Sequence, residues 1–346
     1  MLKIHMYSSA LSVKGQGVGS AYAELIKLLK EYYPDKLEIV INKLGKADIS
    51  HYHTIDPLFY LETFLPGRGV KVGYVHFIPE TIEGSLDLPN FVKKIFYKYI
   101  ISFYKRMDQI VVVNPVFKEK LVKYGISANK ITYIPNFVSK KEFFPKTLDQ
   151  KKKIREKLGI PNDKFVVIGV GQVQERKGVP DFIELAQRHP EMEFIWVGGF
   201  SFGKMTDGYS KLREVVDNPP ENLKFPGILE RSEMNDYYNA ADLFLLPSFN
   251  ELFPMSVLEA FNVGLPVMLR ELDLYHAIID GFYEGAKNVD QMDDMLSNLS
   301  ENPDQLEQLK QRALKGANYY SEERLANIWL DYYTNLVKDR NNVSKK

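Results

Sequence analysis

Short apolar stretches alternate with amphipathic helices along the chain, and the alternation begins a second time halfway along it. In the first half, the predicted strands are 2–6, 37–41, 49–53, 70–75, 109–113 and 131–134. In the second half, they lie within 164–171, 193–199, 223–227, 242–248 and 265–269. Strands that alternate with helices form parallel sheets with helices on their faces. The sequence therefore predicts two doubly wound α/β domains, joined by a charged linker at 139–157.

Length and composition limit the classes of protein that fit. A chain of 346 residues suits two domains of moderate size. The formal net charge of +0 argues against a nucleic-acid partner that is bound through bulk positive charge. The absence of cysteine excludes disulfides, thiol catalysis and thiolate metal sites. The first ten residues lack a signal-peptide pattern, and no run approaches the roughly 20 apolar residues of a spanning helix. We therefore expect a protein that is soluble or lies on a membrane without crossing it.

The stretch SFNELFPMSVLEAF at 248–261 places Glu251 and Glu259 eight positions apart, with Pro254 between them. Proline is favoured in the first turn of a helix, so Pro254 is expected to open one that carries Glu259 and leaves Glu251 in the loop before it. The N-terminus of a helix is an anion site. The N–H groups expected to point outward there belong to Met255, Ser256 and Val257. A phosphate held between two carboxylates that bind hydroxyl groups matches a sugar nucleotide.

A glycine-rich stretch, KGQGVGSAYAEL at 14–25, follows the first predicted strand. Gly15, Gly17 and Gly19 leave room for a ligand to approach the backbone, and the helix behind them favours negative charge. The spacing differs from the dinucleotide fingerprint G-x-G-x-x-G. The stretch is therefore either a phosphate-binding turn or an ordinary flexible turn.

Arg176 and Lys177 follow the first strand of the second half, in GVGQVQERKG at 169–178. Open α/β sheets bind ligands at the carboxyl ends of their strands, and both cations can contact phosphate oxygens. The alternative is a solvated pair of cations on a loop. The sequence contains no Asp-x-Asp, a motif that holds a diphosphate through a divalent cation. The cations and the helix amides would then neutralise a diphosphate without a metal.

Three histidines lie on or next to predicted strands of the first half. His76 closes the strand at 70–75, where it is either a buried structural residue or a site residue. His51 and His53 lie two apart on one strand and so share a face. A metal site there would need a third ligand, and the sequence suggests none.

Taken together and in order, these stretches resemble the retaining GT-B glycosyltransferases of family 4. The two glutamates match that family's E-x₇-E signature, and the resemblance covers nearly the whole chain. The other segments that carry it are GQGVG, DISHYH, YVHF, IPNFVSKKEFFP and NAADLFLLPS. It implies two Rossmann-like domains facing a cleft. We expect an acceptor- and membrane-side domain at 1–145, joined by the C-terminal helix 321–346, and a UDP-sugar-binding domain at 150–320.

The resemblance also implies residue roles. Glu251 would face the hydroxyls of the donor sugar, Glu259 the ribose, and His76 would lie beside the transferring sugar. The groups expected near the diphosphate are Gly17, Arg176, Lys177 and the amides of Met255 and Ser256. The sequence departs from the family where Gln172 replaces the usual arginine, so that Arg176 is expected to supply the missing charge. It departs again where Leu252 and Pro254 replace glycines, which narrows the loop.

The stretch VHFIPETIEGSLDLP at 75–89 and the helix after it resemble bacterial enzymes that add a hexose to a diacylglycerol glycolipid. In the segment at 91–107, apolar side chains recur every four residues and all charged side chains are basic. The basic residues are Lys93, Lys94, Lys98, Lys105 and Arg106. Such a helix is typical of one that lies in a membrane interface. The alternative is a helix that packs on its own sheet with a solvated basic side.

We therefore expect a retaining, metal-independent enzyme that needs no cofactor besides its donor. It would move a hexose from UDP-glucose or UDP-galactose to a membrane glycolipid such as monoglucosyl-diacylglycerol. Residues 91–107 would attach it to the anionic cytoplasmic face of the cell membrane as a peripheral protein. One alternative is the same catalysis on a soluble, polysaccharide or protein acceptor. Another is a non-catalytic sugar-nucleotide-binding module.

Overall fold

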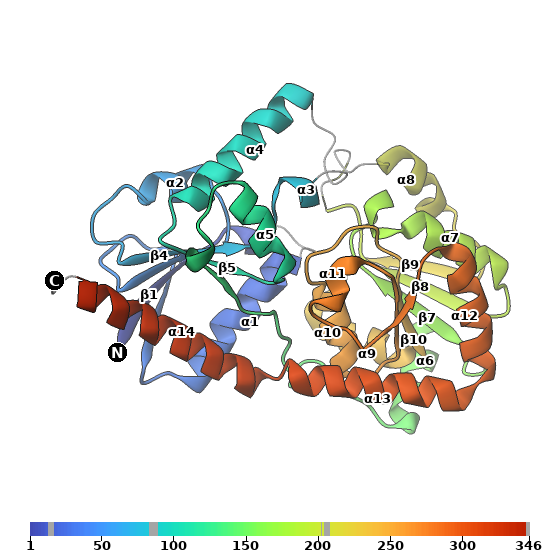
Figure 1. Cartoon of the computed structure of the whole chain (residues 1–346). Helices are drawn as coiled ribbons and strands as arrows, with labels where there is room; N and C mark the ends of the chain where they lie inside the picture. Colours follow the sequence, from blue (N-terminus) through green and yellow to red (C-terminus); the bar gives the residue numbers. More distant parts are fainter. Residues whose placement is uncertain (13–16, 83–88, 202, 204–207, 344–346) are drawn as a thin grey trace.

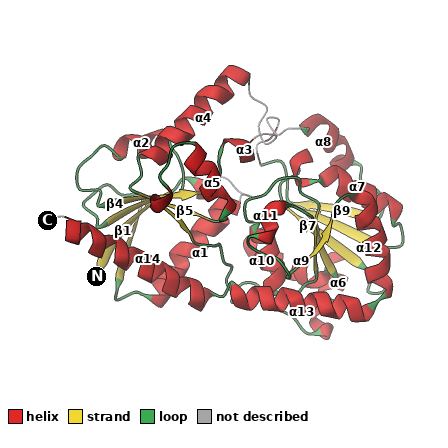
Figure 2. Ribbon diagram, viewed as in Figure 1, coloured by secondary structure: helices red, strands yellow, loops and turns green. Residues whose placement is uncertain are grey.

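The computed structural model describes residues 1–12, 17–82, 89–201, 203 and 208–343, so Gly15 lies outside the described part. Two six-stranded parallel sheets form the centres of two halves, with helices packed around each (Figures 1 and 2). The first sheet contains β1 (Leu2–Tyr7), β2 (Leu37–Ile41), β3 (Ile49–Tyr52), β4 (Val70–Val75), β5 (Gln109–Val112) and β6 (Ile131–Tyr133). The second contains β7 (Val166–Val170), β8 (Glu193–Val197), β9 (Leu223–Gly227), β10 (Leu243–Leu246), β11 (Val267–Arg270) and β12 (Glu284–Ala286). The predicted pair of doubly wound α/β units is confirmed.

The strand order of each sheet determines where a ligand can bind. The first sheet has the order β2-β1-β3-β4-β5-β6, and the second has the order β12-β11-β10-β7-β8-β9. The order reverses between β1 and β3 in one sheet and between β7 and β10 in the other. Ligands of open α/β sheets bind outside the carboxyl ends of the strands at such switch points. The loops after β7 and β10 contain the two predicted cations and Glu251, so the topology brings them to one place.

The helices pack on the sheets through apolar stripes. In the first half they are α1 (Gly17–Tyr32), α2 (Pro57–Glu62), α3 (Pro79–Ile82), α4 (Asn90–Lys105) and α5 (Val116–Lys123). In the second they are α6 (Leu148–Leu158), α7 (Val179–Arg188), α8 (Tyr209–Asp217), α9 (Arg231–Ala240), α10 (Met255–Asn262), α11 (Asp273–His276), α12 (Val289–Glu301) and α13 (Pro303–Tyr319). On α1, for example, the buried residues Ala21, Leu25, Leu28 and Leu29 follow the helical period and form one stripe.

The predicted linker at 139–157 is only partly a linker, because its second half is helix α6. Thr147 caps the helix by accepting a hydrogen bond from the Gln150 N–H, and the Gln150 side chain accepts one from the Thr147 N–H. Gly159 ends it in the left-handed conformation. Buried Ile154 and Arg155 fix α6 to the second half, where Arg155 Nη2 lies 2.7 Å from Asp242 Oδ2. Only residues 134–147 therefore cross between the halves at this point.

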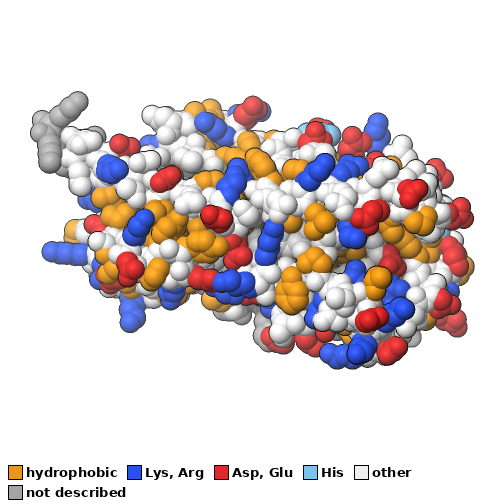
Figure 3. All heavy atoms as spheres, turned by 90° about the horizontal axis from the view of Figure 1, so that it is seen from below, with side chains coloured by type: hydrophobic (Ala, Val, Ile, Leu, Met, Phe, Trp, Pro, Cys, Tyr) orange, Lys and Arg blue, Asp and Glu red, His pale blue; other side chains and the backbone are white. Residues whose placement is uncertain are grey.

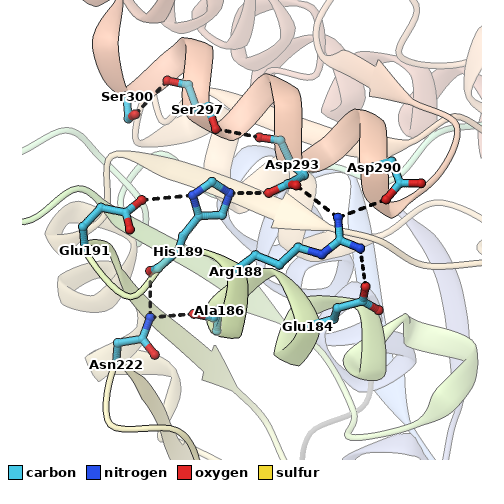
Figure 4. A network of polar contacts seen from close by, with 10 residues as sticks. All are labelled: Glu184, Ala186, Arg188, His189, Glu191, Asn222, Asp290, Asp293, Ser297 and Ser300. Carbon is cyan, nitrogen blue, oxygen red and sulfur yellow. Dashed lines mark hydrogen bonds and ion pairs between the residues drawn. The ribbon is translucent and has the colours of Figure 1, made fainter.

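Charged side chains join α7 to α12 at the outer end of the second half (Figure 4). Arg188 Nη1 lies 3.0 Å from both Asp290 Oδ1 and Asp293 Oδ2. His189 lies between Glu191, at 3.0 Å from its Nδ1, and Asp293, at 2.7 Å from its Nε2. Most of these groups are partly exposed, so we assign the network a modest role in helix packing.

The C-terminal helix α14 (Glu322–Val343) leaves the second half and packs against α1 and β4 of the first (Figure 1). Tyr333 of α14 is fully buried there. The crossing between α13 and α14 is hydrogen-bonded to the crossing at 134–147. The Lys140 N–H donates to Glu322 Oε2 at 3.1 Å, and Lys140 Nζ donates to Asn318 Oδ1 at 2.7 Å. The two chain crossings therefore lie side by side.

Figure 3 shows the molecule from the side of α13 and α14, with acidic and basic side chains interspersed over the described part of this face. The chain has 45 basic and 45 acidic residues in total, and on this face the two signs are mixed and not separated. None of the described helices combines the length and the apolar character that crossing a membrane requires.

Candidate functional site

Glu251 and Lys177 form a buried ion pair where β7 and β10 end side by side. Glu251 lies in the loop before α10 and is 6% exposed, and its Oε1 lies 2.5 Å from Lys177 Nζ. Burial alone would raise the pKa of Glu251, but the charges of Lys177 and then Arg176 outweigh it, and the pKa lies below its ordinary value. Glu251 is therefore ionised at neutral pH and can only accept hydrogen bonds.

Arg176 joins its own loop to the loop that carries Glu251. The backbone oxygen of Arg176 accepts hydrogen bonds from the Phe249 N–H at 2.9 Å and the Ser248 hydroxyl at 3.1 Å. Its Nη1 donates to the Asn250 oxygen at 2.6 Å, while its Nε is buried without a partner among the described residues. The alternative of a solvated pair of cations is wrong, because both cations are engaged with protein groups.

Glycine at position 178 allows these two loops to approach each other. Gly178 has a φ of +72°, and a Cβ there would lie 2.1 Å from the Pro247 oxygen. No other residue fits both the conformation and the contact. The stem of Lys177 lies over Gly171, where a Cβ would meet its Cδ and Cε at 3.6 Å. Because of the contact with Pro247, a side chain at 178 would push the loop that carries Arg176 and Lys177 away from the end of β10.

The N-termini of α1 and α10 approach each other between the two halves. Gly17 is the first residue of α1, and a Cβ there would lie 3.8 Å from Cγ of Met255, the first residue of α10. Both helix ends carry the positive pole of a dipole, so an anion beside them is attracted by both. The Val257 N–H donates to the Pro254 oxygen at 3.2 Å, which removes it from the amides expected to face a ligand. Ser256 is the half-buried second residue of α10.

Two asparagines of the first half hold the backbone around Glu251, and sequence reasoning missed both. Asn114, which follows β5, donates to the backbone oxygens of Leu252 and Leu274 at 3.0 and 3.1 Å. Asn136, which follows β6, donates to the Phe253 oxygen at 3.4 Å. Their partners are more than a hundred residues away in sequence, and a lone asparagine after a strand is no motif. The loop is therefore built by both halves of the chain.

His76 follows β4 and is buried on the first-half side. Its Nε2 lies 3.5 Å from His53 Nδ1, and burial lowers its pKa to about 3. The ring is thus neutral, able to donate one hydrogen bond and to accept another but not to act as a cation. No hydrogen bond between described residues joins His76 to the second half. Four residues later, the backbone oxygen of Glu80 accepts a hydrogen bond from the Asn250 side chain at 3.3 Å. The segment after His76 therefore touches the loop that carries Glu251.

His51 and His53 are packing residues. His51 Nδ1 lies 2.8 Å from the Tyr333 hydroxyl, and the His51 and His53 ring centroids are 4.2 Å apart. Burial lowers the pKa of His51 to about 3, so it is neutral. Among the described residues, no group of three or more potential ligands could hold a metal ion.

Both carboxylate oxygens of Glu259 are engaged by α9. Its Oε2 accepts a hydrogen bond from the Tyr238 hydroxyl at 2.7 Å, and its Oε1 lies 3.1 Å from Arg231 Nη1. Arg231 also pairs with Glu24 of α1, and its Nε lies 2.6 Å from Glu142 Oε2 in the 134–147 crossing. Glu259 was predicted, but these partners were missed, because Arg231 and Glu24 are 207 positions apart and no local pattern joins them.

We predict that Glu24 makes the stability of the protein depend on pH. Burial, opposed by Arg231 and reinforced by Glu142, raises the pKa of Glu24 to about 7 from 4.5. Lys27 and Glu259 are the other charged groups of this cluster. Between those two values the folded protein binds a proton that the unfolded chain has released, so stability falls as the pH rises.

The test compares Glu24→Gln with the wild type by urea denaturation at about pH 5 and about pH 8. Glutamine does not titrate, so the variant does not lose this stability as the pH rises. Its free energy of unfolding relative to the wild type should therefore increase by up to about 3 kcal/mol from the lower to the higher pH. An identical pH dependence of the two proteins would contradict the assignment.

The structure gathers most of the predicted site residues around the β7–β10 switch point and α10. This group contains Glu251, Glu259, Arg176, Lys177, Met255 and Ser256. Gly17 joins the group through its approach to α10. His76 lies in the first half, apart from the group but next in sequence to a segment that contacts it. Two carboxylates, two cations and two helix N-termini could bind a ligand that has both hydroxyl groups and phosphates.

Two family models together match nearly the whole chain. The model described as Glycosyl transferases group 1 matches residues 150–316, and that described as Glycosyltransferase Family 4 matches residues 16–142. The chain is 49% identical over 333 residues to the alpha-galactosylglucosyldiacylglycerol synthase of Streptococcus pneumoniae, which covers 96% of this chain and 89% of that protein. It is 26% identical over 321 residues to the alpha-monoglucosyldiacylglycerol synthase of Acholeplasma laidlawii, covering 88% of this chain and 75% of that protein.

Solved structures share the fold at low sequence identity. Anabaena HepE in complex with UDP and glucose matches with a TM-score of 0.78 at 17% identity, over 97% of this chain and 100% of that one. The sucrose-phosphate synthase from Thermosynechococcus elongatus matches with a TM-score of 0.80 at 13% identity, over 98% of this chain and 100% of that one.

Proposed function

The chain belongs to glycosyltransferase family 4, and from this membership we propose that it transfers a hexose from a UDP-sugar to a membrane glycolipid such as monoglucosyl-diacylglycerol. The family and the GT-B fold that the sequence predicted are both confirmed. We assign donor binding to residues 150–320, and acceptor binding to residues 1–145 together with the C-terminal helix.

One observation carries the proposed acceptor: the 49% identity to the pneumococcal synthase over 96% of this chain. That protein is named for a product with a galactosyl-glucosyl headgroup on diacylglycerol. UDP-galactose is therefore the first donor to test and a glucosyl-diacylglycerol the first acceptor. The name also specifies an alpha linkage. UDP-hexoses carry an alpha linkage as well, so the same outcome here would mean retention of configuration.

The site supports transfer through positioning and charge stabilisation. A diphosphate near the N-termini of α1 and α10 would be neutralised by these helix ends, by Lys177 and by Arg176 in place of the family's arginine at position 172. Glu251, fixed by Lys177, would accept hydrogen bonds from the donor hexose. Neutral His76 would lie beside the transferring sugar. These residues would hold the donor and the acceptor in the geometry needed for transfer while they stabilise the leaving diphosphate.

The surface around α4 supports attachment to a membrane. The predicted single apolar face is divided, because Ile100, Phe103 and Tyr104 pack in the core whereas Phe91 and Ile95 are 68% and 66% exposed. These exposed residues lie in the N-terminal part of α4, which projects from the body (Figure 1). The interpretation of α4 as a helix that packs on its own sheet is thus correct for its C-terminal half. For its N-terminal half we propose contact with the membrane.

Helix α2 and the turn after it add further exposed apolar side chains, beside the C-terminal half of α4. Tyr60 of α2 is hydrogen-bonded to Ser102 of α4 at 2.9 Å between hydroxyl oxygens. The exposed apolar side chains of this segment are Leu58 (72%), Leu61 (62%), Phe64 (57%) and Leu65 (47%). Clustered exposed apolar side chains mark interaction surfaces. With the lysines of α4, they suit the anionic cytoplasmic face of a membrane.

The proposal is tested by offering the purified protein UDP-galactose, UDP-glucose and other UDP-sugars with diacylglycerol, monoglucosyl-diacylglycerol and soluble sugars. Products are identified by mass and their linkage by NMR. A dihexosyl-diacylglycerol with an alpha linkage supports the proposal. Transfer to soluble sugars alone would show that the acceptor is soluble and not a glycolipid. UDP binding without any transfer would indicate a binding module.

Removing either cation is predicted to lower donor turnover strongly. Arg176→Ala and Lys177→Ala each remove a charge that would face the diphosphate, at a cost of about 2–4 kcal/mol in the transition state. The measurement is UDP release with saturating acceptor, and EDTA is expected to leave the wild type active. Activity that is lost with chelator and returns only with Mg²⁺ or Mn²⁺ would show that a metal holds the diphosphate instead.

A further inference from the structure

Glu259 is held on both of its oxygens by side chains that its own helix does not supply. The Tyr238 hydroxyl donates to Oε2 at 2.7 Å, and Arg231 Nη1 donates to Oε1 at 3.1 Å. Glu259 is 6% exposed and Tyr238 is fully buried, so water competes little for these bonds. Its carboxylate is therefore fixed in one orientation before any ligand arrives.

A carboxylate fixed in this way still has acceptor positions that a ligand can use. An ionised carboxylate has about four acceptor positions on its two oxygens. Tyr238 and Arg231 use one position on each oxygen, which leaves about two. Two neighbouring hydroxyl groups, such as those of a ribose, are donors that match the remaining pair.

Arg231 is itself fixed by groups from two other parts of the chain, α1 and the 134–147 crossing. Its guanidinium pairs with Glu24 of α1 and lies 2.6 Å, from Nε to Oε2, from Glu142 of the 134–147 crossing. It also lies over the Phe143 ring, 4.9 Å from Cζ to the ring centroid. A guanidinium is planar and presents its donors in a fixed fork, so these partners determine the direction of the donor that reaches Glu259. Its partners come from both halves of the molecule.

We propose that Arg231 is a positioning residue for ribose recognition: it holds Glu259 so that the remaining acceptor positions of that carboxylate receive the two ribose hydroxyls. Tyr238 holds the other oxygen. The inference rests on the proposed function, because it takes the bound nucleotide to be UDP. It assigns Arg231 no contact with the nucleotide, and its effect passes entirely through Glu259.

The experiment uses two probes, UDP and 2′,3′-dideoxy-UDP, which lacks both ribose hydroxyls. Their affinities are measured by calorimetry for the full-length wild type and for Arg231→Gln. We expect the substitution to weaken the binding of UDP about tenfold, which is the effect of one hydrogen bond to a charged group. The affinity for the dideoxy nucleotide should stay within about twofold of its wild-type value. Arg231→Lys keeps the charge but loses the forked donors, so its affinity for UDP should lie between those of the wild type and Arg231→Gln. In a Glu259→Gln background, Arg231→Gln has no further effect.

Arg213→Gln is the matched control, because Arg213 forms an exposed pair with Asp217 on α8 of the same half. It should change neither affinity. If Arg231→Gln does not fold, Tyr238→Phe makes the same test at the other oxygen. Equal losses for both nucleotides, or a retained preference for UDP, would overturn the proposal. A wild type that shows the ribose preference but transfers nothing to glycolipid would refute the proposed function and leave this inference standing.

Discussion

Replacing Glu251 by glutamine is expected to lower kcat by about 30- to 1,000-fold while UDP affinity changes little. The buried carboxylate lies 2.5 Å from Lys177 Nζ and is ionised. If it binds the donor hexose, the loss of its charge removes about 2–4 kcal/mol that is needed mainly in the transition state. Glu259→Gln is expected to do the reverse and weaken UDP binding more than turnover. Steady-state kinetics and UDP calorimetry on both variants separate these effects.

The same substitution also leaves Lys177 without its buried partner, so stability must be measured beside activity. Breaking a buried ion pair costs about 3–5 kcal/mol of folding free energy. Assays are therefore run well below the measured melting temperature of the variant. Glu221→Gln, at an exposed position of the same half, is the control and should behave as the wild type. A Glu251→Gln enzyme with near-normal kcat would remove Glu251 from the catalytic machinery.

Neutralising the lysines of α4 is expected to release the protein from anionic vesicles. Each cation near such a surface contributes about 1 kcal/mol, so replacing Lys93, Lys94, Lys98 and Lys105 by glutamine removes about 4 kcal/mol at low salt. Arg106 is left in place, because its guanidinium carbon lies 3.9 Å from the centre of the Phe64 ring and its Nη2 donates to the Thr63 oxygen at 3.0 Å. Co-sedimentation with vesicles of anionic lipid measures binding, and transfer to embedded acceptor measures the consequence.

The control variant carries the same change of charge on the second half, at the exposed lysines 152, 153, 310 and 315. It should sediment with vesicles as the wild type does, and both variants should bind UDP normally. Replacing Phe91 and Ile95 by serine should weaken vesicle binding without changing its dependence on salt. A wild type that does not sediment with anionic vesicles at low salt would make α4 an ordinary packing helix and favour a soluble acceptor.

The sequence predicted the features that have a local cause. Eleven strands were placed within a few residues, because a short apolar run between turns is a local signal. The missing strand, β12, has only three residues and the sequence Glu284-Gly285-Ala286, which carries no such pattern. Helix α6 was taken for linker because it is highly charged, although its capping pair, Thr147 and Gln150, is a recognisable start signal.

The candidate site divides in the same way. Glu251, Lys177 and Glu259 belong to short motifs, and the strand order explains why the first two meet. Arg231 and Asn114 could not be found from the sequence, because Arg231 meets Glu259 only through the packing of α9 near α10, and Asn114 meets Leu252 only through the packing of the two halves. The exposure of one half of α4 was also invisible, since its apolar repeat continues evenly through both halves.

The two adjacent chain crossings have a consequence for how the molecule can open. Because Lys140 joins the crossing at 134–147 to the end of α13 and the start of α14, we expect a relative rotation of the halves to pivot there. Displacement in a rotation grows with distance from the pivot. Glu142 lies two residues from Lys140 and touches Arg231, so the proposed ribose side of the site lies near the pivot and would be disturbed least. The rim formed by α3 and α4 lies on the side away from α13 and α14 (Figure 1), so it would be displaced furthest. Opening would then admit an acceptor along the rim for which we propose membrane contact, while the proposed ribose side stays nearly assembled.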